Sequence, residues 1–310
     1  QRQIIKQEVM PMTRIIPGSL LAIFLSIPLL GFAQDFDAVQ ITTIPVRDGI
    51  YMLQGSGGPI MGNIGVSIGD DGTMIVDDQF ASLTDKIVAA IGALTDKPVS
   101  FVVNSHFHFD HTGGNTNFGR AGAYIVAQDN SRKRMESTQV LSGSGRVQEP
   151  YEAAGLPKIT FFDDMRFYFN GNTVDLVYTG NGHTDGDAQV YWREANVIHL
   201  GDMYVRYGLP FIDRDNGGTA DGMIDAIMNI ANLINEETII IPGHGELATR
   251  ADLLEYHDML VVIRGRLVRA KVQGLTEAEM IATNPAEGYA AANERTTGWL
   301  QQAYAEYTSR

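Results

Sequence analysis

The chain has 310 residues, of which 44% are hydrophobic, and its formal net charge is −14 at pH 7. This length fits one large globular domain or at most two small ones. The acidic balance opposes binding to a nucleic-acid backbone, because such binding requires a basic face. The chain contains no cysteine, so disulfides are excluded and any metal site must use His, Asp or Glu.

The first 33 residues are typical of an export signal. Met12 offers a start, Arg14 a positive charge, residues 15–30 an apolar core, and residues 31–33 small side chains at the cleavage positions. The core is interrupted by two prolines and a glycine, and it is shorter than the about 20 residues of a spanning helix. An uncleaved anchor is the alternative. We expect cleavage, a location in the periplasm or outside the cell, and no stable membrane insertion afterwards.

Strand-like and helical segments alternate along the rest of the chain, without an internal repeat. The first half predicts strands at 44–53, 64–69, 73–78, 99–104 and 123–128, and helices at 82–94 and 129–137. The second half predicts a hairpin at 165–178 with an Asn-Gly turn, strands at 188–192, 196–201 and 238–243, and helices at 219–235, 250–273, 276–282 and 288–307. This mixture favours a layered α/β domain with a mixed sheet.

Histidine and aspartate side chains follow the ends of four predicted strands. They are His106, His108, Asp110 and His111 after 99–104, His183 after 173–178, Asp202 after 196–200, and His244 after 238–241. Loops at strand ends are where α/β proteins build sites. Neutral imidazole is the commonest metal ligand in proteins, and His together with Asp suits zinc. This set is large enough for two ions.

The other two histidines are expected to have no metal role. His199 lies inside a predicted strand, and His257 lies inside a helix that reads as exposed. For the segment 106–111 the alternative to a metal site is a solvated polar loop. Such a loop would crowd side chains whose protons compete, so we interpret the segment as part of a metal site.

The segment HFHFDH at 106–111 matches the H-x-H-x-D-H signature of the metallo-β-lactamase superfamily. GHTDGD at 182–187, GD at 201–202 and PGHG at 242–245 resemble the later motifs of that family, in the same order. The likeness covers roughly residues 40–250. It implies an α/β fold, the four-layer αββα sandwich, with the metal site at one edge of the two sheets. Residues 34–310 would form this domain, including a helical C-terminal segment.

The resemblance also implies a role for each residue of the cluster. His106, His108 and His183 would bind a first zinc ion, Asp110, His111 and His244 would bind a second, and Asp202 would bridge the two. Asp77 ends the segment TMIVD and resembles the aspartate of the family's first motif. We expect Asp77 to orient one of the ligands; a helix-capping role is the alternative.

For the activity, the resemblance implies hydrolysis of a carbonyl substrate by a hydroxide that bridges two zinc ions. Asp110 would orient the hydroxide or carry a proton to the leaving group. The export signal and the sequence around GHT and VYW resemble those of true β-lactamases, the enzymes of antibiotic resistance. The expected substrate is therefore a small molecule, a β-lactam or a related cyclic amide or lactone.

Two departures from the lactamase pattern keep other activities open. The closest lactamases carry Cys where this chain has Asp202, and an aspartate bridge is commoner in relatives that cleave thioesters, lactones and phosphoesters. Those lactamases also place a substrate-binding Lys where this chain has Val205, so the adjacent Arg206 is a candidate substitute. The alternatives are a thioesterase or phosphoesterase, a persulfide dioxygenase-like oxidoreductase with one iron, and a non-catalytic metal-binding protein.

Candidates for the pocket lining come from residues near the ligands. The segment 54–63 resembles the mobile flap of the family, and its Pro59, Ile60 and Met61 are candidates to cover an apolar substrate. An ordinary hairpin turn is the alternative for this segment. Four aromatic residues beside ligands are further candidates: Phe107, Phe109, Tyr204 and Tyr207.

Overall fold

The computed structural model describes residues 35–142 and 144–308. The export signal expected in residues 1–33 lies outside these residues. Among the described residues, no helix combines the length and the apolar character needed to cross a membrane. The described residues belong to one compact unit.

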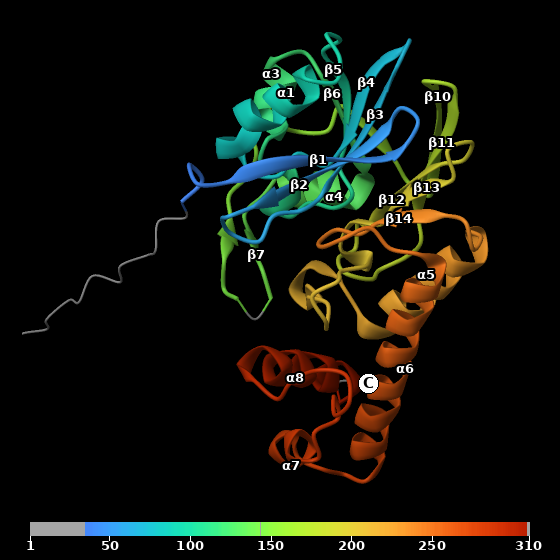
Figure 1. Ribbon diagram of the computed structural model, residues 1–310. Helices are drawn as coiled ribbons and strands as arrows, with labels where there is room; N and C mark the ends of the chain where they lie inside the picture. Colours follow the sequence, from blue (N-terminus) through green and yellow to red (C-terminus); the bar gives the residue numbers. More distant parts are fainter. Residues whose placement is uncertain (1–34, 143, 309–310) are drawn as a thin grey trace, which may run out of the picture. The chain divides into compact units, whose positions relative to one another are not determined.

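A seven-stranded sheet has an antiparallel half and a parallel half (Figure 1). Its strands, in spatial order, are β1 (Gln40–Arg47), β2 (Ile50–Ser56), β3 (Ile64–Gly69), β4 (Gly72–Val76), β5 (Val99–Val103), β6 (Tyr124–Gln128) and β9 (Ile159–Phe161). Strands β1 to β4 pair antiparallel, whereas β4, β5, β6 and β9 pair parallel. Parallel neighbours need crossover connections, and helices α1 (Thr84–Gly92) and α3 (Asn115–Arg120) lie in two of them.

The segment 44–53, which we predicted as a single strand, is a hairpin. The pairing of β1 with β2 ends at Arg47 and Ile50, so the turn falls on Asp48 and Gly49. Gly49 has a φ of 74°, in the left-handed region that two-residue hairpin turns use. The apolar pattern continues on both sides of this turn, which explains why the segment reads as one strand.

The second sheet has five strands and follows the sequence order. Its strands are β10 (Asp164–Phe169), β11 (Asn172–Tyr178), β12 (Ala188–Trp192), β13 (Val197–His199) and β14 (Ile239–Ile241). The predicted hairpin is confirmed, because β10 and β11 pair across a turn at Asn170 and Gly171 with φ values of 54° and 73°. Only β14 joins its neighbour in parallel.

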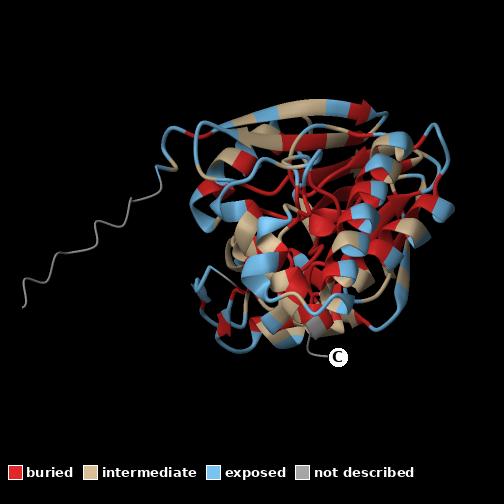
Figure 2. Cartoon of the chain, turned by 90° about the horizontal axis from the view of Figure 1, so that it is seen from below, coloured by how far each residue is buried: buried red, intermediate tan, exposed pale blue. Residues whose placement is uncertain are grey.

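The two sheets pack face to face through a buried apolar layer, visible as the red interior of Figure 2. Met74 and Val76 of the first sheet belong to this layer, together with Val190 and Trp192 of the second. Successive side chains of a strand point to opposite faces. Ile75 and Tyr191, one position along, therefore pack outward into two other apolar clusters.

Helices cover both outer faces of the sheets. Ile87 of α1 and Phe118 of α3 pack against the first sheet. Ile227 of α5 (Ala220–Leu233) and Ile263 of α6 (Arg250–Val272) belong to the cluster on the second sheet. Helix, sheet, sheet and helix layers thus form the predicted αββα sandwich, and this prediction is confirmed.

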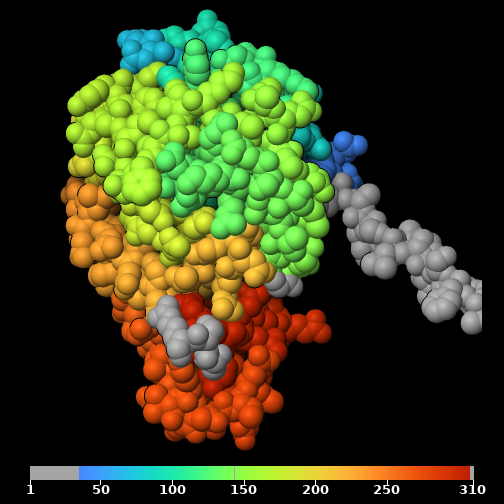
Figure 3. Space-filling model, turned by 180° about the vertical axis from the view of Figure 1, so that it is seen from behind, coloured from blue at the N-terminus to red at the C-terminus, as the bar shows by residue number. Residues whose placement is uncertain are grey.

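The C-terminal helices extend the layer on the second sheet. Helix α7 (Glu277–Ala282) matches its prediction, whereas α8 (Glu294–Thr308) begins six residues after the predicted 288. Leu300 and Tyr304 of α8 join the same apolar cluster as Ile263, and Figure 3 shows the atoms of the C-terminal part of the chain in orange and red. The short elements are α2 (Phe109–Thr112), α4 (Asp129–Met135), β7 (Gln139–Val140), β8 (Val147–Gln148), and the 3₁₀ turns η1 (Ala81–Leu83), η2 (Gly201–Met203) and η3 (Arg214–Asn216).

Candidate metal centre

The seven predicted ligands come together where four segments leave the sheets. His106 to His111 follow β5, His183 follows β11, Asp202 follows β13, and His244 follows β14. They form three overlapping groups in which ligand atoms lie within 4.8 Å of one another: His106, His108 and His183; His106, His111 and Asp202; and Asp110, His111 and His244. All are buried except Asp110, which is partly exposed.

Two histidines of the first group have fixed tautomers. His183 Nδ1 lies 2.7 Å from the carbonyl oxygen of Phe211, and His108 Nε2 lies 2.8 Å from Asp213 Oδ2. Carbonyl and carboxylate oxygens accept hydrogen bonds, so each of these nitrogens carries the proton. The other two nitrogens, His183 Nε2 and His108 Nδ1, are therefore bare, and they lie 2.9 Å apart. Two lone pairs at this distance repel unless a cation lies between them.

The pKa of His183 agrees with a neutral, unprotonated ligand. Burial lowers the pKa of His183 to about 4. Burial opposes the charge on Asp213, but hydrogen bonds from His108, the Ser142 N–H and Asn216 lower the pKa of that carboxyl to about 2. Asp213 therefore stays ionised and can hold the proton on His108 Nε2.

His106 is oriented through Ser105. The Ser105 hydroxyl donates to Asp77 Oδ2 at 2.7 Å and lies 3.0 Å from His106 Nδ1. Since its single proton is used on Asp77, the hydroxyl accepts from His106 Nδ1–H. His106 Nε2 is then bare, and it is buried without a hydrogen-bond partner among the described residues. Burial, followed by the charge of His111, holds the pKa of His106 well below its usual value.

The group of Asp110, His111 and His244 is supported in the same way. His111 Nδ1 lies 2.7 Å from Asp77 Oδ2, and His244 Nδ1 lies 2.9 Å from the carbonyl oxygen of Met61. Their Nε2 atoms are 3.2 Å apart. Burial lowers the pKa of His111, but Asp202, Asp110 and Asp77 raise it well above its usual value. The surrounding carboxylates thus favour a positive charge at this position.

Asp202 lies between His183 on one side and His111 with His244 on the other. Its Oδ2 lies 3.6 Å from His183 Nε2, while its Oδ1 lies 3.2 Å from His111 Nε2 and 3.3 Å from His244 Nε2. Burial opposes the charge of this carboxylate, but His244 and His111 hold its pKa well below the usual value. One ionised carboxylate thus offers one oxygen to His183 and the other to His111 and His244.

Together these residues fit divalent metal ions. Five imidazoles each direct one nitrogen toward the same interior, and the outer nitrogen of each is held by a carboxylate, a carbonyl or a hydroxyl. This is how metal-binding histidines are normally supported in proteins. His nitrogens and carboxylate oxygens without sulfur are donors that suit zinc, and they also suit iron.

Asp77 occupies a strained backbone position at the end of β4. Its φ is 65°, which is uncommon for residues other than glycine. One oxygen accepts from the backbone N–H of Ser105 at 2.7 Å, and the other contacts His111 and the Ser105 hydroxyl. Asp77 therefore contacts one histidine of the cluster directly and another through Ser105. Strain of this kind is typical of functional sites.

A cavity of about 350 Å³ opens over the cluster. Besides the ligands His108, Asp110, Asp202 and His244, it is lined by Pro59, Ile60, Phe109, Leu141, Ser144, Arg146, Tyr207 and Phe211. Four of the lining candidates, Pro59, Ile60, Phe109 and Tyr207, are thus present. Sequence reasoning missed the others, and it missed Asp213, because none belongs to a motif.

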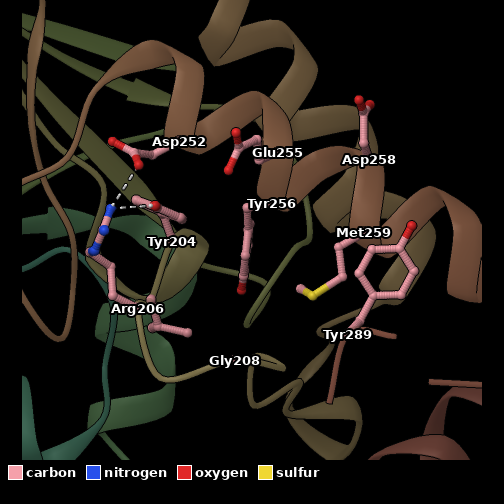
Figure 4. A pocket seen from close by; sticks show the side chains of 10 residues that line it. Tyr204, Arg206, Gly208, Asp252, Glu255, Tyr256, Asp258, Met259 and Tyr289 are labelled. Atoms are coloured by element: carbon pink, nitrogen blue, oxygen red, sulfur yellow. Dashed lines mark hydrogen bonds and ion pairs between the residues drawn. The ribbon is translucent and has the colours of Figure 1, made fainter. Parts of the chain in front are cut away.

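Four residues expected to bind substrate do not line this cavity. The Met61 side chain packs in the core and only its carbonyl contacts His244, while Phe107 is fully buried. Tyr204 and Arg206 line a different pocket (Figure 4). There, Arg206 Nη1 lies 3.2 Å from the Tyr204 hydroxyl and 3.3 Å from Asp252 Oδ1. Val205 pairs with His244 in an isolated bridge, and alternation along an extended segment places Tyr204 and Arg206 on the side away from the ligands.

The two remaining histidines lie outside the cluster. His199 is buried; its Nε2 lies 3.1 Å from the carbonyl oxygen of Asn63, and its Nδ1 accepts from Gly201 N–H. It is a hydrogen-bonded core residue, as expected. His257 was expected on an exposed helix, but it is only 9% exposed on α6, beside Asp258.

Known proteins share both the sequence pattern and the fold. A family model described as the metallo-beta-lactamase superfamily matches residues 57–244. The metallo-beta-lactamase type 2 of Bacillus cereus is 26% identical over 194 residues, which cover 61% of this chain and 69% of that protein. A probable metallo-hydrolase of Bacillus subtilis strain 168, YqgX, is 24% identical over 208 residues, which cover 67% of this chain and 95% of that protein.

Solved structures agree on the fold. A metallo-beta-lactamase from Pontibacter korlensis matches with a TM-score of 0.59 at 17% identity, covering 71% of this chain and 99% of that one. A double mutant of the sec-alkyl sulfatase PisA1 matches with a TM-score of 0.67 at 18% identity, covering 86% of this chain and 50% of that one. The family match, the ordered motifs and the converging ligands lead to one conclusion: the chain belongs to the metallo-beta-lactamase superfamily of metal-dependent hydrolases.

Proposed function

We propose that this protein is an exported dinuclear zinc hydrolase that opens a β-lactam or a related cyclic amide or lactone. The observation that carries the proposal is the position of Asp202. Its two oxygens face two separate groups of ligands, His183 on one side and His111 with His244 on the other. A carboxylate placed in this way favours two ions over one, and two ions held close together are typical of hydrolytic sites.

Each part of the site would have its own role in the reaction. Two zinc ions bound here would supply an activated water and polarise the carbonyl of the substrate. Asp110 is the partly exposed carboxylate of the cluster, and its Oδ2 lies 3.5 Å from His244 Nε2. From this position it can orient the water or pass a proton to the leaving group. The apolar walls of the cavity, including Phe109 and Phe211, would exclude bulk water.

The substrate class is supported by the size of the cavity and by the relatives. A volume of about 350 Å³ suits a small molecule rather than a polymer. The Bacillus cereus relative is named a metallo-beta-lactamase, which favours a lactam. The Bacillus subtilis relative is named only a probable metallo-hydrolase, so esters and thioesters belong in the test.

The test combines metal analysis with a hydrolysis panel on purified, zinc-loaded protein. The panel contains nitrocefin, a carbapenem, an acyl-homoserine lactone, a glutathione thioester and a phosphodiester. We expect two zinc ions per chain and turnover of a lactam or the lactone. Turnover of only the thioester or the phosphodiester would show that the substrate is an ester of that kind and not a lactam or lactone. If the protein as expressed contains one iron per chain and oxidises a persulfide, it is an oxidoreductase and not a hydrolase.

The role of Asp110 is tested by Asp110→Asn. We expect this variant to lose most turnover while it keeps most of its zinc, because the amide retains an oxygen ligand but cannot take up a proton. Full turnover with zinc retained would remove the proposed role. Export is tested separately by fractionating cells that express the full chain, with the protein expected in the periplasm or the medium.

A further inference from the structure

Arg146 extends from a short hairpin into the cavity over the metal ligands. The hairpin pairs β7 with β8, and Arg146 directly precedes β8. Its guanidinium carbon lies 5.2 Å from the centre of the Phe109 ring, and both residues line the cavity. Since Phe109 precedes the ligand Asp110 in the chain, this cation lies close to the reacting centre.

The charge of Arg146 is not neutralised by a neighbour. In residues 35–142 and 144–308, no carboxylate and no hydrogen-bond acceptor contacts its guanidinium group, which lies over the Phe109 ring. Arg206 pairs with Asp252, and Arg134 pairs with Asp185. Arg295 stacks on the ring of Tyr207 and donates to the carbonyl oxygen of Leu209. Arg146 is therefore available to bind an anion that enters the cavity.

The hairpin that carries Arg146 is tied to the support of the metal ligands. Ser142 N–H donates to Asp213 Oδ1 at 3.1 Å, while the other oxygen of Asp213 holds His108. Gln148 Nε2 donates to the carbonyl oxygen of Phe107 at 2.8 Å, between two ligand histidines. The first bond ties the loop of the hairpin to Asp213, and the second ties β8 to the histidine segment, so the backbone that carries Arg146 is held beside the cluster.

The rest of the wall is apolar. Pro59, Ile60, Leu141 and Phe211 line the same cavity, and Ile60 is 64% exposed. A solvent-exposed isoleucine beside an unpaired arginine is suited to a ligand that has both an apolar body and a negative charge. A planar guanidinium binds carboxylates and similar oxyanions through paired hydrogen bonds.

We propose that Arg146 binds an oxyanion, such as a carboxylate, on the substrate, and that the enzyme prefers acidic substrates with an apolar body to neutral ones. This inference rests on the proposed hydrolytic function and names a specificity residue for it. The bound anion would stay at the hairpin while the carbonyl group reaches the cluster. Arg146 is thus a binding residue, and its main effect should be on KM.

The experiment compares nitrocefin with its methyl ester, which has the same lactam but no carboxylate. We expect Arg146→Ala to lower kcat/KM for nitrocefin about tenfold to a hundredfold, mostly through KM, because a hydrogen bond to a charged group is lost. Turnover of the ester should change less than twofold. Arg146→Lys should recover part of the loss, and Arg206→Ala, a matched arginine outside the cavity, should leave both substrates unaffected. Equal losses for acid and ester would overturn the proposal.

A binding measurement separates this inference from the hydrolytic function. Calorimetry on the chelator-treated protein would compare 4-phenylbutyrate with its uncharged amide. We expect the acid to bind more tightly to the unaltered chain, and Arg146→Ala to remove that preference. If the preference persists in the variant, Arg146 is not the anion site, whatever the protein hydrolyses. If no panel substrate is hydrolysed but the preference depends on Arg146, the hydrolytic proposal fails and the anion site stands.

Discussion

His111 Nδ1 lies 2.7 Å from Asp77 Oδ2, and both side chains are fully buried. Asp77 keeps this position although its backbone has a φ of 65°. The carboxylate accepts a hydrogen bond from His111 Nδ1, so His111 Nε2 is turned toward Asp202 and His244. Asp77 thus determines which nitrogen of His111 faces the cluster.

Asp77→Asn should weaken metal binding without removing any ligand. The amide keeps the size of the side chain but lacks the charge that orients His111 and Ser105, and loss of such support typically costs tenfold to a hundredfold in metal affinity. Zinc affinity would be measured by competition with a chromophoric chelator. Asp175→Asn, a buried carboxylate on β11 outside the cluster, is the control and should keep the affinity of the unaltered chain. An unchanged affinity in Asp77→Asn would show that His111 needs no anionic partner.

Single histidine substitutions should remove one ion at a time. His183 belongs only to the group with His106 and His108, while His244 belongs only to the group with Asp110 and His111. If two ions bind, His183→Ala and His244→Ala should each retain about half of the bound zinc. Elemental analysis after dialysis measures the content, and His257→Ala on α6 should retain all of it. If either variant lost all the zinc, the two groups would not be independent.

The convergence of the candidate ligands could be predicted from the sequence because four of them lie close together in the chain. His106, His108, Asp110 and His111 lie within six residues, and the other ligands stand beside glycines directly after strands. Loops at strand ends are held by the rigid sheets, so residues placed there are candidates for a common site. The apolar patterns predict only a layered α/β domain with a mixed sheet; the αββα sandwich was predicted because the motifs resemble those of the family.

The walls of the cavity could not be predicted, because they depend on side-chain direction and on distant contacts. Arg206 is next to Val205 in the sequence, yet alternation along the segment turns it toward Asp252. Arg146 belongs to no motif and is carried by two-residue strands that no periodic pattern reveals. Its hairpin is placed by Asp213, which is distant in the sequence.

Gly62 should not tolerate even a methyl group. A Cβ at this position would lie 2.5 Å from His111 Cε1 and 2.6 Å from its Nδ1. Gly62 is also held in place, because its N–H donates to the carbonyl oxygen of Asp110 and its own carbonyl accepts from Gln79. Gly62→Ala should therefore push His111 away from Asp77, weaken zinc binding and destabilise the fold by about 1–3 kcal/mol, as overpacked cores do.

The control for Gly62→Ala is the same substitution at Gly265, an exposed position in the middle of α6 with open space around its Cβ. Alanine there should stabilise the fold by about 0.5–1 kcal/mol, since glycine is a poor helix former. Urea unfolding and zinc titration measure both variants. Normal zinc affinity in Gly62→Ala would show that His111 moves freely.

A buried ion cluster on the second sheet should make stability depend on acid pH. Asp175 on β11 accepts from Arg166 Nε at 2.6 Å and from Arg193. Burial raises the pKa of this carboxyl, but the hydrogen bonds from Arg166 and Arg193 outweigh that effect, and the net pKa is lowered from 3.8. Between the folded and unfolded pKa values the unfolded chain binds more protons, so the stabilisation is complete above pH 3.8 and is lost as the pH falls through the folded pKa.

Asp175→Asn should therefore cost stability near neutral pH and cost progressively less in acid. Because both arginines are about half exposed, we expect a loss of about 1 kcal/mol at pH 7. Urea midpoints at pH 7, 5 and 3 measure the difference between the variant and the unaltered chain. The difference in urea midpoint should be similar at pH 7 and 5 and smaller at pH 3. Asp70→Asn, on the exposed surface, is the control and should have nearly the midpoint of the unaltered chain at all three pH values. If the difference in urea midpoint for Asp175→Asn stays constant down to pH 3, the two arginines do not hold Asp175 ionised.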